Sequence, residues 1–126
     1  MKEIIETDKA PLPIGPYNQA IKANGCLYIS GQICINPLDN TLVNDSLENE
    51  THQVLKNLGA ILSAAGLDYK DVVKCTVFIK DMHQFSRINT IYGQYFEDAS
   101  APARETVEVS NLPKFVSVEI SAIAVY

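Results

Sequence analysis

One amphipathic helix, followed closely by an alternating strand, constrains the fold of this chain more than any other feature. The helix carries an apolar stripe at helical spacing, formed by Val54, Leu58, Ile61, Leu62 and Ala65. Ser46 or Asn49 is expected to cap its start, and Gly66 stands where helices commonly end in a left-handed residue. Residues 72–80 then alternate apolar and polar side chains, as a half-buried strand does. Because each element must bury its apolar side, the pair predicts a helix packed on a sheet.

The rest of the chain supplies further strands and a second helix. Strands are expected at Lys2–Ile5, Gln19–Ala23, Cys26–Ser30, Arg104–Val109 and Val116–Ala124. The dipeptide Asn24-Gly25 is typical of a hairpin turn between the second and third of these. A second helix is expected over Met82–Phe96, with Phe85, Ile88, Tyr92 and Phe96 on its buried side. Strand–helix–strand crossovers are right-handed, so both helices should cover one face of a single mixed sheet.

Length and composition narrow the class of protein. The chain has 126 residues, 47% of them apolar, which favours one domain over residues 1–126. No window reaches the roughly 18–20 apolar residues of a membrane span, and the first residues show no signal-peptide pattern. The cysteines Cys26, Cys34 and Cys75 are odd in number and lack C-x-x-C spacing, as in a protein with reduced thiols. We therefore expect cytoplasmic localisation and no membrane partner.

Charge and metal-ligating residues exclude further classes. The formal net charge is −5, and the 10 Lys and Arg residues are scattered, which argues against nucleic acid as a partner. His52 and His83 lie far apart in the sequence and outside any zinc pattern. No glycine-rich phosphate-binding motif occurs. The sequence therefore predicts neither a metal nor a cofactor.

The last two predicted strands each carry polar side chains on one face. In both strands, small or branched apolar residues alternate with polar ones. The apolar set is expected under the helices, because burial of one face fixes the register. Arg104, Thr106 and Glu119 are then expected together on the helix-free face, with Glu105 pointing the opposite way. A domain of this size has no second lobe to cover that face. If the face is functional, we expect another chain to cover it.

Seven segments, taken in order, carry a family resemblance. They are Ile14-Gly-Pro-Tyr-Asn-Gln-Ala20, Leu27-Tyr-Ile-Ser-Gly-Gln-Ile33, Val54-Leu-Lys-Asn-Leu58, Val73-Lys-Cys-Thr-Val-Phe-Ile-Lys-Asp-Met82, Asn89-Thr-Ile-Tyr92, Pro102-Ala-Arg104 and Val118-Glu-Ile-Ser-Ala-Ile-Ala124. In this order and spacing, the chain resembles the reactive-intermediate deaminase (RidA, YjgF-type) family from about residue 3 to its C-terminus.

The resemblance implies a chorismate-mutase-like α+β fold, assembled as a homotrimer with sites between subunits. In that fold the last strand inserts between earlier ones, so a simple hairpin of the last two strands is not expected. The resemblance also implies a cofactor-free hydrolase, an imine deaminase. It would convert 2-imino acids such as 2-iminobutanoate and 2-iminopropanoate to 2-oxo acids and ammonia, and small 2-imino and 2-oxo acids are the implied ligands.

Arg104, Glu119 and Thr106 are the catalytic candidates that match the family. A guanidinium group can grip the carboxylate of a 2-imino acid with two hydrogen bonds, which suits Arg104. A carboxylate can hold a water molecule and move protons, which suits Glu119. Thr106 stands where many family members have Cys, and hydrolysis does not require a thiol there because water is the nucleophile.

Four more residues match substrate-binding positions of the family: Tyr17, Ser30, Gly31 and Asn89. Hydroxyl groups, an unobstructed backbone N–H and an amide can each bind a small ligand. We expect them to come partly from the subunit next to the one that supplies Arg104 and Glu119.

Other interpretations stay open at the level of sequence. Arg104 could form a structural ion pair with Glu105, Glu108 or Glu119, and Glu119 could be a hydrogen-bonded carboxylate at a subunit interface. The protein could also be a ribonuclease or translation inhibitor, activities attributed to some relatives, or a non-enzymatic trimer that binds small molecules. The lack of a basic patch and of a histidine pair argues against the ribonuclease.

Overall fold

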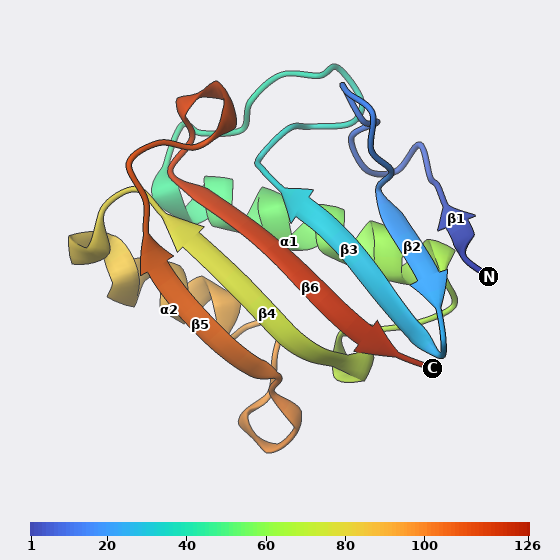
Figure 1. The fold of residues 1–126 in the computed structure, drawn as a ribbon. Helices are drawn as coiled ribbons and strands as arrows, with labels where there is room; N and C mark the ends of the chain where they lie inside the picture. The colour runs from blue at the N-terminus through green and yellow to red at the C-terminus, as the bar shows by residue number, and fades with distance from the viewer.

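The computed structural model describes residues 1–126 as one six-stranded sheet with two α-helices on one of its faces (Figure 1). The strands are β1 (Glu3–Ile5), β2 (Ala20–Ala23), β3 (Cys26–Gln32), β4 (Val72–Ile79), β5 (Ala103–Glu108) and β6 (Val118–Val125). The helices are α1 (Leu47–Ala64) and α2 (Phe85–Tyr92). The predicted α+β class, with a mixed sheet and two helices on one face, is confirmed. Neither helix has the length and apolar character needed to span a membrane.

The last strand, β6, lies in the middle of the sheet, whose order is β1-β2-β3-β6-β4-β5. It pairs antiparallel with β3 on one side and with β4 on the other. Every second residue from Val118 to Ala124 is buried. β5 pairs parallel with β4 and forms an edge of the sheet. The insertion implied by the family resemblance is therefore confirmed, and β5 and β6 form no hairpin.

Helix α1 and its ends follow the sequence pattern. The hydroxyl of Ser46 accepts a hydrogen bond from the backbone N–H of Asn49 at 3.0 Å and caps the helix. Gly66, just beyond the end, has a φ of 77°, the left-handed conformation expected there. The stripe residues Val54 and Ile61 are fully buried. The apolar stripe therefore packs against the sheet, where α1 contacts β3 and β6.

The turn between β2 and β3 also follows its sequence signal. Asn24 and Gly25 have φ values of 51° and 75°, and two positive φ angles are what a type I′ turn requires. The turn closes on the pair Ala23 and Cys26, so the predicted hairpin is confirmed.

Two predicted elements extend two or more residues beyond the observed ones at one end. The helix expected over Met82–Phe96 consists of a 3-10 turn at Met82–Gln84 followed by α2, which ends at Tyr92 and is followed by Gly93. Glycine weakens a helix interior because it loses more backbone freedom than other residues. The strand expected to begin at Val116 begins two residues later. The preceding segment Pro113–Phe115 is a tight turn with left-handed backbone at its last two residues.

The buried carboxylate of Glu50 connects α1 to the start of β6. This residue is 3% exposed. Its Oε2 accepts hydrogen bonds from the backbone N–H groups of Ser117 and Val118 at 2.7 and 2.9 Å. Burial raises the pKa of Glu50, an effect opposed by the two backbone donors. The helix thereby fixes the point at which the chain enters the central strand.

We predict that Glu50→Ala lowers the free energy of unfolding by about 2–4 kcal/mol, because two backbone N–H groups lose their acceptor. Glu48→Ala is a matched control in the same helix, since Glu48 forms an exposed ion pair with Arg87 at 2.8 Å. Exposed ion pairs contribute little to stability, so the control should lose much less. Urea denaturation followed by circular dichroism measures both variants. Equal losses would contradict the structural role of Glu50.

Candidate functional site

Glu119 lies in β6 on the side of the sheet that no helix covers. It pairs in register with Phe78 of β4, whereas its neighbours Val118 and Ile120 are buried on the helix side. The half-buried carboxyl has a raised pKa because burial disfavours its charged form. A raised pKa favours a carboxyl that both accepts and returns protons. The helix-free face predicted for Glu119 is confirmed.

Gly31 leaves the space that the Glu119 side chain occupies. The pairing of β3 with β6 shifts between Ile29 and Gln32, and this irregularity lies beside Glu119. A Cβ atom added at Gly31 would lie 2.9 Å from Cδ of Glu119, too close for two carbon atoms to pack. The absence of a side chain at Gly31 therefore determines where the carboxylate can lie.

Glu119 and Gly31 line a small cavity of about 80 Å³. Apart from Gln32 of β3, the other walls come from segments outside the strands and helices α1 and α2, and they are mostly apolar: Pro11, Leu12, Ile14, Tyr17, Gln19, Gln32, Ile33, Ile35, Pro113 and Lys114. Pockets with apolar walls and few polar groups are typical of small-molecule sites. The cavity therefore suits a small ligand beside Glu119.

Arg104 lies in the edge strand β5 and turns to the other face of the sheet, toward α2. It pairs in register with Cys75, which is buried on the helix side. Its Nη1 donates a hydrogen bond to Oδ1 of Asn89 at 2.8 Å. The rings of Phe85 and Tyr92 lie 5.5 and 4.7 Å from the guanidinium carbon, within cation–π range. These three partners share one face of α2, and we call them the Arg104 cradle.

The cradle leaves Arg104 able to bind an anion. A guanidinium has several N–H donors, and the Asn89 contact engages only one nitrogen. Arg104 is exposed and forms no ion pair within the chain. Within the chain, Arg104 therefore forms no structural ion pair with Glu105, Glu108 or Glu119. A second cavity, of about 410 Å³, borders Arg104, Asn89 and Tyr92.

The expectation that Arg104, Thr106 and Glu119 share the helix-free face is wrong. Arg104 and Thr106 pair with Cys75 and Val77 of β4, which are both buried on the helix side. The physical reason is the position of β5 at the edge of the sheet, where neither face is fully covered and polar residues are tolerated on both. Alternation in such a strand separates two sets of side chains but does not show which set faces the helices.

Glu105 shares the open face with Glu119 instead. It forms an ion pair with Lys74 at 2.8 Å and accepts a hydrogen bond from Thr76, its partner in register. These contacts with Lys74 and Thr76 lower the pKa of Glu105. As predicted, Glu105 points away from Arg104, but the face it occupies is the one assigned to Arg104 from the sequence.

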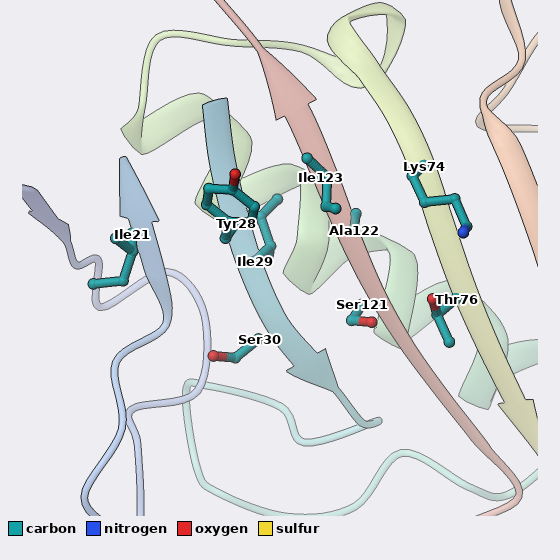
Figure 2. Close-up of a pocket in the computed structure, with 9 residues that line it drawn as sticks. All are labelled: Ile21, Tyr28, Ile29, Ser30, Lys74, Thr76, Ser121, Ala122 and Ile123. Atoms are coloured by element: carbon teal, nitrogen blue, oxygen red, sulfur yellow. The ribbon is translucent and has the colours of Figure 1, made fainter. Parts of the chain in front are cut away.

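A groove of about 280 Å³ crosses the open face of the sheet (Figure 2). Tyr28 and Ser30 of β3, Ser121 of β6 and Thr76 of β4 line it. The Ser30 hydroxyl donates a hydrogen bond to the backbone oxygen of Asn18 at 2.5 Å. Ser30 therefore anchors the chain just before β2 in addition to bordering this groove.

The structure divides the predicted site residues into two groups. Tyr17, Gly31 and Glu119 line one cavity, and Asn89 and Arg104 line the other. Ser30 and Thr106 line neither of these two cavities. No group of three or more His, Cys, Asp or Glu side chains is placed to hold a metal ion.

The aromatic part of the Arg104 cradle was not predicted from the sequence. The sequence pattern assigns Phe85 and Tyr92 to the buried stripe of the second helix, yet Phe85 is only partly buried. The spacing of Phe85, Asn89 and Tyr92, four and three residues apart, places an amide between two rings on one helix face. That pattern was the available signal, because a buried stripe rarely contains an asparagine.

Fold and site together define an α+β protein whose candidate carboxylate and guanidinium lie on opposite faces of one sheet. The chain belongs to the family described as Endoribonuclease L-PSP, which matches residues 7–126. The predicted relation to the reactive-intermediate deaminases is confirmed.

Relatives and a solved structure match nearly the whole chain. A RutC family protein of Synechocystis is 54% identical over 124 residues, which cover 98% of this chain and 95% of the relative. A mouse protein named 2-iminobutanoate/2-iminopropanoate deaminase is 47% identical over 125 residues, 99% of this chain and 92% of that protein. The crystal structure of E. coli TdcF with bound serine has a TM-score of 0.92 at 41% identity and covers 98% of both chains.

We predict that Glu119→Gln is more stable than the wild type at neutral pH and that this difference disappears in acid. Burial raises the folded-state pKa of Glu119, so stability falls as the pH rises from the ordinary pKa of a glutamate through that raised value. This loss does not occur in the variant. The melting temperature of the variant should exceed that of the wild type near pH 7 and converge with it in acid. Thermal denaturation across a pH series measures this.

Glu105→Gln is the matched control on the same face. Its pKa is lowered, so the charged form stabilises the fold and the variant should lose stability at neutral pH, with the difference fading in acid. If both variants changed the melting temperature in the same direction at neutral pH, the environments described for these two glutamates would be contradicted.

Proposed function

We propose that this protein hydrolyses small 2-imino acids, such as 2-iminobutanoate and 2-iminopropanoate, to 2-oxo acids and ammonia. The observation that supports this proposal is that the chain has two half-sites, each with only part of the groups that the reaction needs. One has a carboxyl of raised pKa in a small, mostly apolar cavity, and the other has a cradled guanidinium with unused donors. Together they supply a proton carrier and an anchor for the substrate carboxylate.

The reaction needs few protein groups. Water adds to the imine carbon and one of its protons passes to the nitrogen, which gives a carbinolamine. The remaining hydroxyl proton then passes to the nitrogen as the carbon–nitrogen bond breaks, which leaves a 2-oxo acid and ammonia. The Glu119 carboxylate accepts the proton from water and returns it to the departing nitrogen. Arg104 binds the substrate carboxylate and orients the imine carbon, while Tyr17 and the Gly31 backbone border the same space.

The proposal includes an assembly, because one chain does not bring its two half-sites together. Arg104 turns to the helix face of the edge strand, whereas Glu119 lies on the open face, and β4 separates their strands. The open face also carries exposed apolar side chains, including Tyr28 and Val107, which favours contact with another chain. The homotrimer implied by the family resemblance would place Arg104 of one chain against the Glu119 cavity of the next.

The comparisons support the substrate class. The mouse relative is named for the hydrolysis of 2-iminobutanoate and 2-iminopropanoate. The TdcF structure is described with bound serine, a small molecule with a carboxylate and a nitrogen on the adjacent carbon. Substrates of this size are compatible with the cavity beside Glu119. A site that combines the Arg104 guanidinium with this small cavity fits a small anion better than an RNA strand, which requires a basic surface.

The test couples a threonine dehydratase, which releases the unstable imine, to this protein and follows the appearance of 2-oxobutanoate. We predict acceleration by the wild type and a loss of about 100-fold or more in kcat/KM for both Arg104→Ala and Glu119→Gln, because each removes a charge from the reacting complex. Arg87→Ala is the matched control on α2, where Arg87 pairs with Glu48, and it should keep wild-type activity.

Three outcomes would overturn the proposal. The first is a wild-type protein that gives no acceleration at any concentration. The second is binding of 2-oxobutanoate without imine turnover, which would indicate a non-enzymatic binding protein. The third is full activity in Glu119→Gln, which would exclude Glu119 as the proton carrier.

A further inference from the structure

The segment between β1 and β2 forms one wall of the Glu119 cavity without any regular structure of its own. Pro11, Leu12, Ile14 and Tyr17 all come from it, and no helix or strand lies between Ile5 and Ala20. A loop of this length needs fixed contacts if it is to hold site residues in place. The nature of those contacts therefore determines how well the cavity is formed.

The Gln19 side chain supplies these contacts. It is 2% exposed. Its Oε1 accepts a hydrogen bond from the Thr7 backbone N–H at 2.8 Å. Its Nε2 donates to the backbone oxygens of Thr7, Ala10 and Pro11 at 2.9, 3.2 and 2.8 Å. A single buried amide thus gathers the start of the loop around itself.

Few other contacts could take over this role. Beyond the Gln19 bonds, the hydrogen bonds of residues 7–14 are local, such as Lys9 N–H to the Thr7 hydroxyl at 3.2 Å. Ala10 is the loop's one fully buried apolar anchor in that stretch. Because the Gln19 donors are engaged by three backbone carbonyls, the side chain acts on the site through the loop.

We infer that Gln19 is a positioning residue that holds the loop carrying Leu12, Ile14 and Tyr17 over the Glu119 cavity. The inference rests on the proposed function, because it concerns the binding of substrate in that cavity. With the amide removed, the loop opens more often and the substrate loses a formed wall. The expected effect is on substrate affinity, whereas the chemistry at Glu119 remains available to molecules that do bind.

The experiment uses Gln19→Met in the full chain, since Met keeps the length and apolar volume of the side chain while removing all four hydrogen bonds. Gln94→Met, at an exposed glutamine without side-chain hydrogen bonds, is the matched control. We expect Gln19→Met to raise KM in the dehydratase-coupled assay about tenfold with a smaller change in kcat. The control should match the wild type.

Limited trypsin digestion supplies a readout that does not depend on the reaction. Lys9 precedes the buried Ala10, so cleavage of the bond between them requires opening of the loop. Mass spectrometry should show faster cleavage there in Gln19→Met and no change in Gln94→Met. Should Gln19→Met fail to fold, Gln19→Leu, which also replaces the amide by an apolar side chain, gives the same comparison.

The two hypotheses fail in different ways. A wild-type protein without imine turnover would overturn the proposed function, while the trypsin comparison would still report on the loop. A folded Gln19 variant with wild-type KM would overturn the positioning role, whatever the cleavage rate. A Gln19 variant that resists trypsin cleavage after Lys9 as well as the wild type does would also overturn the positioning role.

Discussion

The register of β4 with its two neighbours is the constraint on which the candidate site depends. β4 pairs Cys75 with Arg104 on one side and Phe78 with Glu119 on the other. Because side chains of a strand alternate between faces, partners of Cys75 and of Phe78 must point in opposite directions. The guanidinium and the carboxylate are thereby kept on opposite faces of the same sheet. The proposed function therefore requires a second copy of the chain to bring them to one small molecule.

Buried polar side chains hold the irregular segments that form the Glu119 cavity. Glu50 binds the start of β6, Gln19 binds the loop before β2, and Asn57 of α1 donates to the backbone oxygens of Ile33 and Ile35 at 3.0 and 2.9 Å. A buried polar group without a partner is costly, so each of these contacts strongly prefers one geometry. The cavity is therefore shaped by a few specific hydrogen bonds as well as by apolar packing.

The sequence predicted the fold best where burial is complete. In β6, the buried residues Val118 and Ile120 leave one possible face for Glu119, and the prediction there is correct. In β5, Arg104 and Val107 are both exposed on an edge strand, so alternation alone could not assign their faces. The place of β6 inside the sheet depends on long-range pairing, which local patterns do not contain, and came from the family resemblance.

The individual site residues could be proposed from the sequence, but their grouping could not. Tyr17 and Glu119 meet in one cavity only because β6 enters beside β3. The aromatic rings beside Arg104 resemble core residues when the helix is considered alone, since Tyr92 is in fact buried. Their contact with a cation appears only when β5 lies beside α2. The arrangement of strands and helices in the folded chain therefore determines which of the proposed site residues lie together.

The most direct test of a site shared between chains is complementation between Arg104→Ala and Glu119→Gln. Each variant alone lacks one half of every site and should be inactive. When the two are refolded together in equal amounts, about one quarter of the sites should receive an intact Arg104 from one chain and an intact Glu119 from the next. Recovery of about that fraction of wild-type imine hydrolysis is the predicted result. Mixed assemblies without any recovered activity would contradict the account.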